Sequence, residues 1–357
     1  MSNLKALLIS LGSESSRWIY EELKKRFHKA EMINIRKMRL GFNHKRKELL
    51  VEKGLLGQYD AVYIRGSFKY RDFLMSIASL LPQDVYTPIS PESFLIMHNK
   101  LLTHLVLLKE KVPMPMTYIA PTMSSAKQIL KDVKYPVMIK FLEGTQGKGV
   151  IFLESYAAAS SFLDSLEKEK NFLIQEYIPS NGEDIRLIVT GDEVVAAMKR
   201  KAAPLEARSN YHAGGSVEKY DPEEETVKTA VKAARAVGAE ICGVDIIETE
   251  LGPLVLEINA SPGIQGITKA TEKNVAGAIA EYIYRRTIEE KEKKKHKESR
   301  KLLESLNKEQ PTEIITNLSV RAGKIVLPQI VSKITRLRDE EEVEIFLGDG
   351  YFTVKKS

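Results

Sequence analysis

The segment that most constrains the fold of this chain is residues 243–263, GVDIIETELGPLVLEINASPG. Two apolar runs, residues 244–249 and 254–258, stand on either side of a turn that contains Gly252 and Pro253. Short apolar runs that meet at such a turn predict the two strands of a β-hairpin. The segment therefore predicts one paired element of a sheet.

Polar side chains occupy positions in this hairpin that a half-buried sheet does not require. Asp245 belongs to the first strand, and Glu257 and Asn259 belong to the end of the second strand. Pairing places Asp245 across from the end of the second strand, close to the other two. Two carboxylates and an amide oxygen are hard ligands, which Mg²⁺ or Mn²⁺ prefers beside nucleotide phosphates. By itself, however, the segment favours a surface hairpin with solvated carboxylates.

Length and composition set the wider limits. At 357 residues the chain exceeds one ordinary core, so two or three domains are expected. The hydrophobic fraction of 43% suits a globular protein, and no apolar run approaches the roughly 18 residues of a membrane span. The first residues predict a strand rather than a targeting segment.

The single cysteine, Cys242, excludes an intramolecular disulfide and fits the cytoplasm, which is the expected location. The net charge of +6 permits anionic ligands without indicating nucleic-acid binding.

Residues 1–92 predict a small open α/β domain. Apolar strands are expected over residues 4–11, 30–35 and 59–64, with a helix over residues 14–28 and a boundary at the prolines of residues 87–91. Arg65 follows the third strand. Because the carboxyl ends of strands in open α/β sheets face the ligand crevice, Arg65 is a candidate for binding an anionic acceptor. A solvated arginine is the alternative.

Two lysines and a glycine-rich loop follow. A helix expected over residues 93–109 carries Lys100, and a strand over residues 135–140 ends at Lys140. The loop at residues 143–150, EGTQGKGV, has glycines that free the backbone to approach a phosphate. It lacks the helix of a P-loop and would act as a flexible lid between two strands. Taken singly, each feature has an ordinary explanation, as a surface lysine or as a hairpin loop.

The strand expected over residues 172–177, FLIQEY, ends before a proline. Glu176 and Tyr177 at its end are placed to hold an adenine ring and its ribose, although a strand that ends at a proline is also ordinary. Asp184 and Arg186 open the next hairpin, which turns at Gly191. A helix is expected over residues 222–237, before the hairpin of residues 243–263.

Together these segments are recognisable. In order and spacing, VMIKFLEGTQGKGV, FLIQEYI, GEDIRLIVTGDEVVAAMKR, ARSNYHAGG and GVDII…GPLVLEINASPGI resemble the motifs of ATP-grasp ligases, and among these the RimK-type glutamate ligase family. The resemblance covers roughly residues 1–287. It implies a small open α/β N-terminal domain at residues 1–92, followed at residues 93–287 by an ATP-grasp fold of two α+β subdomains that grip ATP.

The resemblance also implies roles for individual residues. It places at the nucleotide Lys100, Lys140, Gly144, Gln146, Gly147, Glu176, Tyr177, Asp184, Arg208, Ser209 and Asn210. Within this set the lysines contact the phosphates, the residues of the glycine loop form the lid, Glu176 and Tyr177 lie at the adenine, and Asp184 lies near the ribose. Asp245, Glu257 and Asn259 match the metal ligands, which would hold two Mg²⁺ or Mn²⁺ ions.

These residue types predict the chemistry of an ATP-dependent carboxylate–amine ligase. Attack of an acceptor carboxylate on the γ-phosphate makes an acyl phosphate, which an amine then displaces, with release of ADP and phosphate. Lys140 and Arg186 would supply fixed positive charge, with Arg186 placed for the acyl phosphate or the tetrahedral oxyanion. The lid would exclude water. The resemblance implies L-glutamate as the amine donor, and a protein C-terminus or a small cofactor as the acceptor. A ligase of lysine or arginine biosynthesis that depends on an amino-group carrier protein is the related alternative.

The composition changes beyond residue 287. Residues 288–312 mix Lys and Glu and predict a charged helical linker rather than a basic nucleic-acid arm. Residues 313–357 predict a small β-rich module with a hairpin turn at Gly348 and Gly350, and this module resembles AbrB-type swapped hairpins. That resemblance implies a homo-oligomer and DNA contact through Arg321 and Lys324. It also supports a second hypothesis, a nucleotide-sensing DNA-binding regulator.

Overall fold

The computed structural model describes residues 3–44, 47–51, 54–55, 59–142, 149–166, 171–202, 215–307, 319–321, 324–326, 342–349 and 351–356. The chain forms two compact units, Met1–His296 and Lys297–Ser357, and each unit is described by itself. The candidate site lies entirely in the first unit.

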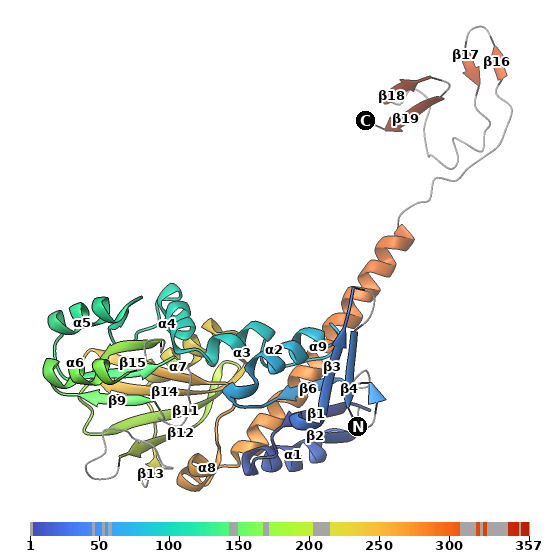
Figure 1. The fold of residues 1–357 in the computed structure, drawn as a ribbon. Coiled ribbons are helices and arrows are strands. Elements are labelled where there is room, and N and C mark those ends of the chain that lie inside the picture. The colour runs from blue at the N-terminus through green and yellow to red at the C-terminus, as the bar shows by residue number, and fades with distance from the viewer. Residues whose placement is uncertain are drawn as a thin grey trace. The chain divides into compact units, whose positions relative to one another are not determined.

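The first unit begins with the open α/β domain that the sequence predicts (Figure 1). Its parallel sheet has the order β2-β1-β6, formed by Lys29–Asn34, Lys5–Ser10 and Ala61–Ile64. Helix α1, Glu14–Arg26, connects β1 to β2, and the Ser13 hydroxyl caps it by accepting from the Ser16 backbone N–H. Strands β3, β4 and β5 (Met38–Phe42, Lys47–Val51 and Gly54–Leu55) form a separate antiparallel sheet, and two 3₁₀ turns (Ile35–Lys37 and Phe68–Tyr70) and helix α2 (Arg71–Leu80) complete this region.

The prediction of a single helix over residues 93–109 is wrong. The structure has two helices there, α3 (Pro91–Met97) and α4 (Lys100–Lys109). The break occurs because Asn99 is an N-cap: its side-chain oxygen accepts from the backbone N–H groups of Leu101 and Leu102. Lys100 is therefore the first residue of a helix rather than a mid-helix residue, and its backbone N–H donates to the Leu142 carbonyl.

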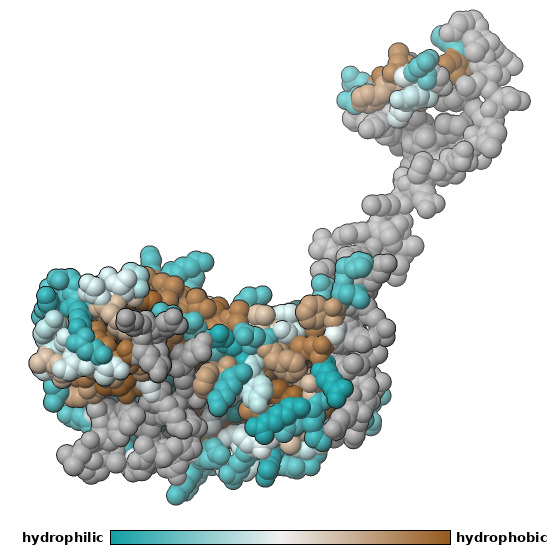
Figure 2. Space-filling view, in the orientation of Figure 1, coloured by the Kyte–Doolittle hydropathy of each residue, from teal (hydrophilic) through white to brown (hydrophobic). Residues whose placement is uncertain are grey.

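A four-stranded antiparallel sheet forms the first of two further layers. Its order is β7-β10-β8-β9, with strands Thr117–Ile119, Phe172–Glu176, Val137–Phe141 and Val150–Leu153. Helices α5 (Met123–Asp132) and α6 (Tyr156–Ser165) pack on it and enclose a small core of their own, separate from the main core. Apolar residues Leu102, Leu105 and Leu108 of α4 remain exposed, and apolar surface is visible over this region in Figure 2.

A five-stranded antiparallel sheet forms the second layer. Its order is β13-β12-β11-β14-β15, with strands Ser216–Lys219, Glu193–Lys201, Glu183–Thr190, Ile241–Thr249 and Gly252–Asn259. The hairpin predicted at residues 243–263 is confirmed as β14 and β15, the last two strands of this sheet. Helix α7 (Glu224–Ala236) packs against them, and α8 (Gln265–Thr271) follows β15.

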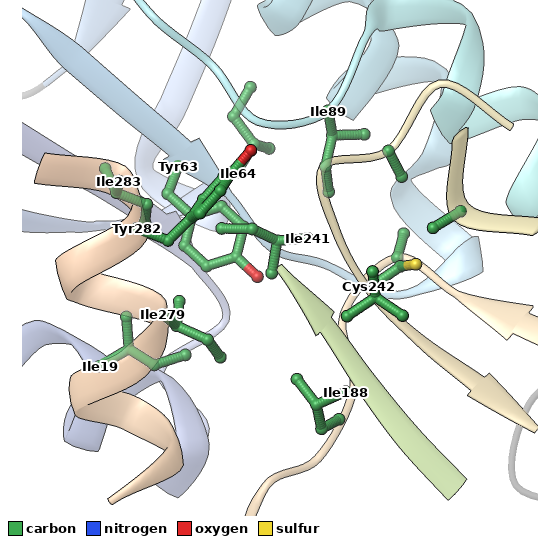
Figure 3. Close-up of a cluster of buried hydrophobic side chains, with 14 of the residues drawn as sticks. Ile19, Tyr63, Ile64, Ile89, Ile188, Ile241, Cys242, Ile279, Tyr282 and Ile283 are labelled. Carbon is green, nitrogen blue, oxygen red and sulfur yellow. The ribbon is translucent and has the colours of Figure 1, made fainter. Parts of the chain in front are cut away.

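The N-terminal sheet and the five-stranded sheet share one hydrophobic core. Figure 3 shows Ile279 and Ile283 of α9 beside Ile19 and Tyr63 of the N-terminal domain, with Ile241 of β14 nearby. All five of these side chains are essentially inaccessible to solvent. The domain boundary near residue 92 remains a prediction, because the contacts of this core run across it.

Helix α9 is longer than the sequence suggested. It runs from Val275 to Asn307, so the helix expected at residues 273–286 and most of the expected linker form one element. In the second unit, β16 and β17 (Ser319–Arg321 and Lys324–Val326) pair as one hairpin, and β18 and β19 (Val343–Gly348 and Tyr351–Lys356) pair as another. Among the described helices, none combines the length and the apolar character needed to cross a membrane.

Candidate active site

The hairpin β14–β15 brings together the three residues proposed from its sequence. Asp245 pairs directly with Glu257, and Gly243 pairs with Asn259. The register shifts between Asp245 and Ile246, so that Leu256 is the extra residue of a β-bulge. Because of this bulge, Asp245 faces Glu257 rather than Leu256, and the three polar side chains lie on the same face of the hairpin.

Two arginines surround the Asp245 carboxylate, which belongs to a residue only 4% exposed. Arg186 donates from Nε to Oδ1 at 2.7 Å and from Nη2 to Oδ2 at 2.6 Å. The Nη2 group of Arg200 lies 2.9 Å from Oδ2. Burial alone would raise the pKa of Asp245, but the guanidinium groups of Arg186 and Arg200 outweigh it and lower the pKa to about 2. The carboxylate is therefore ionised across the physiological range.

Arg200 is a residue of the site that the sequence argument missed. It is 4% exposed and donates to both oxygens of Asp184, from Nε and Nη2, each at 2.6 Å. Burial would lower the pKa of this guanidinium, but Asp245 and Asp184 raise it above its usual value. Asp184, Arg200, Asp245 and Arg186 thus form a continuous chain of alternating charges across three neighbouring strands. The Asp184 carboxylate, expected near a ribose, is held within this chain.

Asp245, Glu257 and Asn259 carry oxygen atoms of the kind that bind a divalent metal ion. A carboxylate offers about four lone-pair positions, and the two arginines use three at Asp245, so Oδ1 keeps one for a cation. The amide nitrogen of Asn259 is buried without a hydrogen-bond partner in the described part of the chain. Within that part, no three His, Cys, Asp or Glu side chains converge as a metal-binding group. The assignment of Asp245, Glu257 and Asn259 as metal ligands remains a prediction.

Two cavities meet at this hairpin. A cavity of about 140 Å³ is lined by residues of both sheets and includes Lys140. A cavity of about 420 Å³ is lined on one side by Arg186 and on the other by residues of the N-terminal domain. The residues common to both linings are Lys100, Arg200, Asp245, Leu256 and Glu257. A group bound in one cavity would therefore meet a group bound in the other beside the two carboxylates.

Lys140 lies on β8 and lines the smaller cavity. Its contact with phosphates remains a prediction. Its Nζ donates to Oε1 of Gln175 at 2.5 Å. Burial lowers the pKa of Lys140 to about 8, and the nearby charge of Lys100 adds to this effect, while Glu257 opposes it. The structure thus brings both predicted lysines to the same cavity.

Glu176 and Tyr177 lie at the rim of the smaller cavity, at the end of β10. Their backbone N–H groups donate within the protein, that of Glu176 to the Met116 carbonyl at 2.9 Å and that of Tyr177 to the Pro136 carbonyl at 3.3 Å. The Tyr177 ring packs edge-on against Phe152, with 4.9 Å between ring centroids. Their assignment to an adenine ring remains a prediction.

Arg65 lines the larger cavity but is 3% exposed. Its guanidinium donates to the Ser16 hydroxyl at 3.2 Å, to the Tyr63 hydroxyl at 3.1 Å and to the Pro262 carbonyl at 2.7 Å. The alternative of a solvated arginine is therefore wrong. These bonds join the N-terminal domain to the loop that follows β15, and contact with an acceptor remains a prediction.

Six of the predicted nucleotide-binding residues lie outside the described residues. They are Gly144, Gln146 and Gly147 of the glycine-rich loop, and Arg208, Ser209 and Asn210.

Comparison with known proteins gives a consistent result. Residues 97–283 match the model of the RimK-like ATP-grasp domain. A probable alpha-L-glutamate ligase of Photobacterium profundum is 39% identical over 278 residues, which cover 75% of this chain and 91% of that protein. A protein of the same name from Vibrio cholerae is 36% identical, over 79% of this chain and 95% of its own length.

Solved structures of distant relatives share the fold. A RimK domain ATP-grasp protein of Sphaerobacter thermophilus superposes with a TM-score of 0.61 at 20% identity, covering 78% of this chain and 99% of that protein. The ATP-grasp ligase PsnB, in a complex with a minimal precursor, Mg and ADP, gives a TM-score of 0.61 at 18% identity, over 79% of this chain and 98% of that protein.

Proposed function

This chain belongs to the RimK-like ATP-grasp family of ATP-dependent ligases, and from that premise we propose that it joins the amine of L-glutamate to an acceptor carboxylate through an acyl phosphate. The observation that supports this most strongly is the meeting of the two cavities at Asp245 and Glu257. A ligase of this type needs the γ-phosphate and the acceptor carboxylate to meet at one point, beside groups that neutralise charge.

The smaller cavity is the proposed nucleotide site. Lys140 and Lys100 supply positive charge toward the phosphates, and Glu176 and Tyr177 stand where the base would enter. Asp245, Glu257 and Asn259 would hold Mg²⁺ or Mn²⁺, two ions in this proposal, which neutralise the charge of the transferring phosphoryl group. The complex of PsnB with Mg and ADP supports Mg²⁺ and an adenine nucleotide as the bound groups.

The larger cavity is the proposed site for the acceptor and the amine. Its described lining holds four basic side chains, Arg65, Lys100, Arg186 and Arg200, while its acidic side chains are the two at the junction. Such a lining favours anionic ligands, as a carboxylate acceptor and glutamate both are. Arg186 lines this cavity and not the smaller one, so it is placed to stabilise the acyl phosphate or the oxyanion formed when the amine attacks.

The reaction then follows from these positions. The acceptor carboxylate attacks the γ-phosphorus, the bond to the ADP oxygen breaks, and ADP leaves. The neutral amine of glutamate attacks the acyl carbon, the bond to the phosphate oxygen breaks, and phosphate leaves as the amine loses its proton. The names of the curated relatives support glutamate as the donor, and the precursor complex of PsnB supports a peptide as one class of acceptor.

The test incubates the purified protein with ATP, Mg²⁺, labelled glutamate and a cell extract, and identifies by mass spectrometry what acquires the label. Glu257→Gln should abolish this labelling, whereas Glu250→Gln, at the exposed turn of the same hairpin, should leave it unchanged. Undiminished labelling by Glu257→Gln would contradict the metal assignment. Transfer of labelled lysine in place of glutamate would favour the carrier-protein alternative.

We propose separately that the second unit joins copies of this chain into a homo-oligomer and that it contacts DNA. Its described hairpins expose apolar side chains, among them Ile345 and Leu347, and they also expose Lys324. Two-stranded hairpins are marginal alone, so such side chains favour association. DNA binding that weakens steeply with salt and requires residues 313–357 supports the proposal, and a monomer without DNA affinity contradicts it.

A further inference from the structure

Gln175 occupies a buried polar position directly behind Lys140. It is 1% exposed and lies on β10, between β7 and β8. Its side-chain oxygen accepts from Lys140 Nζ at 2.5 Å. Its side-chain nitrogen lies 2.9 Å from Nε2 of His104 and donates to Oγ1 of Thr117 at 2.8 Å. The buried amide group therefore has three hydrogen-bond partners, Lys140, His104 and Thr117.

The neighbours of this amide determine which way it points. Nδ1 of His104 lies 2.7 Å from the Lys100 carbonyl oxygen, which can only accept, so Nδ1 carries the hydrogen. In a neutral imidazole the other nitrogen then presents a lone pair, and Nε2 must accept from Gln175. Burial lowers the pKa of His104 to about 4, which keeps the ring neutral.

The hydrogen bonds of Thr117 indicate the same orientation of the Gln175 amide. Its hydroxyl donates to the Pro115 carbonyl at 2.9 Å, so its lone pairs face the Gln175 nitrogen. With two acceptors facing the amide nitrogen, the oxygen is left for the ammonium group of Lys140. The opposite orientation would place the N–H groups of Gln175 against that ammonium group and would leave the lone pairs of His104 and Thr117 facing an oxygen.

We propose that His104 is a positioning residue for the nucleotide: its lone pair fixes the amide of Gln175, and that amide holds Lys140 toward the smaller cavity. The inference rests on the proposed function, in which Lys140 binds the phosphates. His104 itself lines neither cavity. The same chain of hydrogen bonds begins at the Lys100 carbonyl, so it ties the start of α4 to the lysine of β8.

The test compares His104→Met, which removes the lone pair, with His104→Gln, whose side-chain oxygen restores an acceptor. His104→Met removes the bond from Gln175 and also the bond to the Lys100 carbonyl. Loss of the bond from Gln175 alone should weaken binding of Mg–ADP and raise the KM for ATP about five-fold. The glutamine variant should return both to within about two-fold of the wild type. The KM for glutamate should change less than the KM for ATP, because Lys140 and Gln175 line the smaller cavity and not the larger one. Equal affinity for Mg–ADP in His104→Met and the wild type would overturn the inference.

A double variant separates positioning from general stability. When Lys140→Met has already removed the ammonium group, adding His104→Met should cause no further loss of Mg–ADP affinity. An equal loss in both backgrounds would mean that His104 acts only on the stability of the fold, and would overturn the inference. If His104→Met does not fold, Thr117→Val and Thr117→Ser address the same amide from the other side, with the same expected and contradicting results. Failure of the wild-type protein to bind Mg–ADP would instead contradict the proposed function.

Discussion

Replacing Arg200 with methionine should destabilise the first unit severely, although the two side chains are similar in length. Arg200 is 4% exposed and donates to Asp184 through two bonds of 2.6 Å, and its Nη2 lies 2.9 Å from Asp245. Asp245 keeps Arg186 in the variant, but Asp184 loses both of these bonds while it remains 7% exposed. A buried carboxylate then lacks the guanidinium that compensates its charge.

Removal of one partner from a buried ion pair costs about 3–5 kcal/mol, so the free energy of unfolding should fall by that amount. Urea denaturation followed by circular dichroism measures the change. The matched control is Lys201→Met on the same strand, whose ammonium group pairs with Glu183 at 3.0 Å and whose side chain is 61% exposed. Surface pairs contribute about 0–1 kcal/mol, so this control should barely move the midpoint.

A second substitution tests the cause of the loss. Adding Asp184→Asn to Arg200→Met removes the uncompensated charge, and the double variant should recover about 1–3 kcal/mol relative to the sum of the single losses. If Arg200→Met is no less stable than Lys201→Met, the buried chain of charges does not stabilise the fold as argued. Strictly additive losses would show that Asp184 and Arg200 are not coupled.

Two further predictions concern groups outside the hairpin. The pKa of Glu22 is lowered to about 2 by Lys25, against burial, with help from Arg26, so its ionised form stabilises the fold above pH 4.5 and this contribution is lost as the pH falls toward 2. Glu22→Gln should therefore cost on the order of 3 kcal/mol at neutral pH and almost nothing near pH 2, as measured by urea titrations at both pH values; a loss independent of pH would contradict the ionic origin. Burial raises the pKa of the Cys242 thiol to about 12, so iodoacetamide at pH 8 should leave the native protein unmodified and add one label per chain in urea, as counted by mass spectrometry; labelling of the native protein would show that this strand opens readily.

The sequence predicted which segments of the site are strands, because the apolar pattern of each strand lies within a few consecutive residues. The hairpin that carries Asp245 and Glu257 has a clear alternation of apolar runs and a turn. The pairing register of the two strands could not be predicted from this pattern, because a bulge at Leu256 decides which residue faces Asp245. A second irregularity, between Ile188 and Val189, likewise decides that Asp184 pairs with Arg200 and not with its neighbour. Bulges depend on packing against the rest of the sheet, and they explain why Arg200 was missed.

Other differences arise from contacts between distant segments. Asn99 does give a local signal, since asparagine before a helix is a favoured N-cap, and it could have divided the helix that was predicted as one. Arg65 gives no such signal, because the Pro262 carbonyl to which it donates lies 197 positions away in the sequence. The same holds for His104 and Gln175, which are 71 positions apart and meet only when α4 packs beside β10.

The central claim is that the acceptor carboxylate is activated as an acyl phosphate at the junction of the two cavities. It is tested most directly with an acceptor, identified by the glutamate labelling, whose carboxylate carries oxygen-18 at both positions. Transfer through an acyl phosphate predicts one labelled oxygen in the released phosphate, one in the new amide and none in ADP. Labelled oxygen in AMP, or phosphate free of label while product forms, would contradict the account.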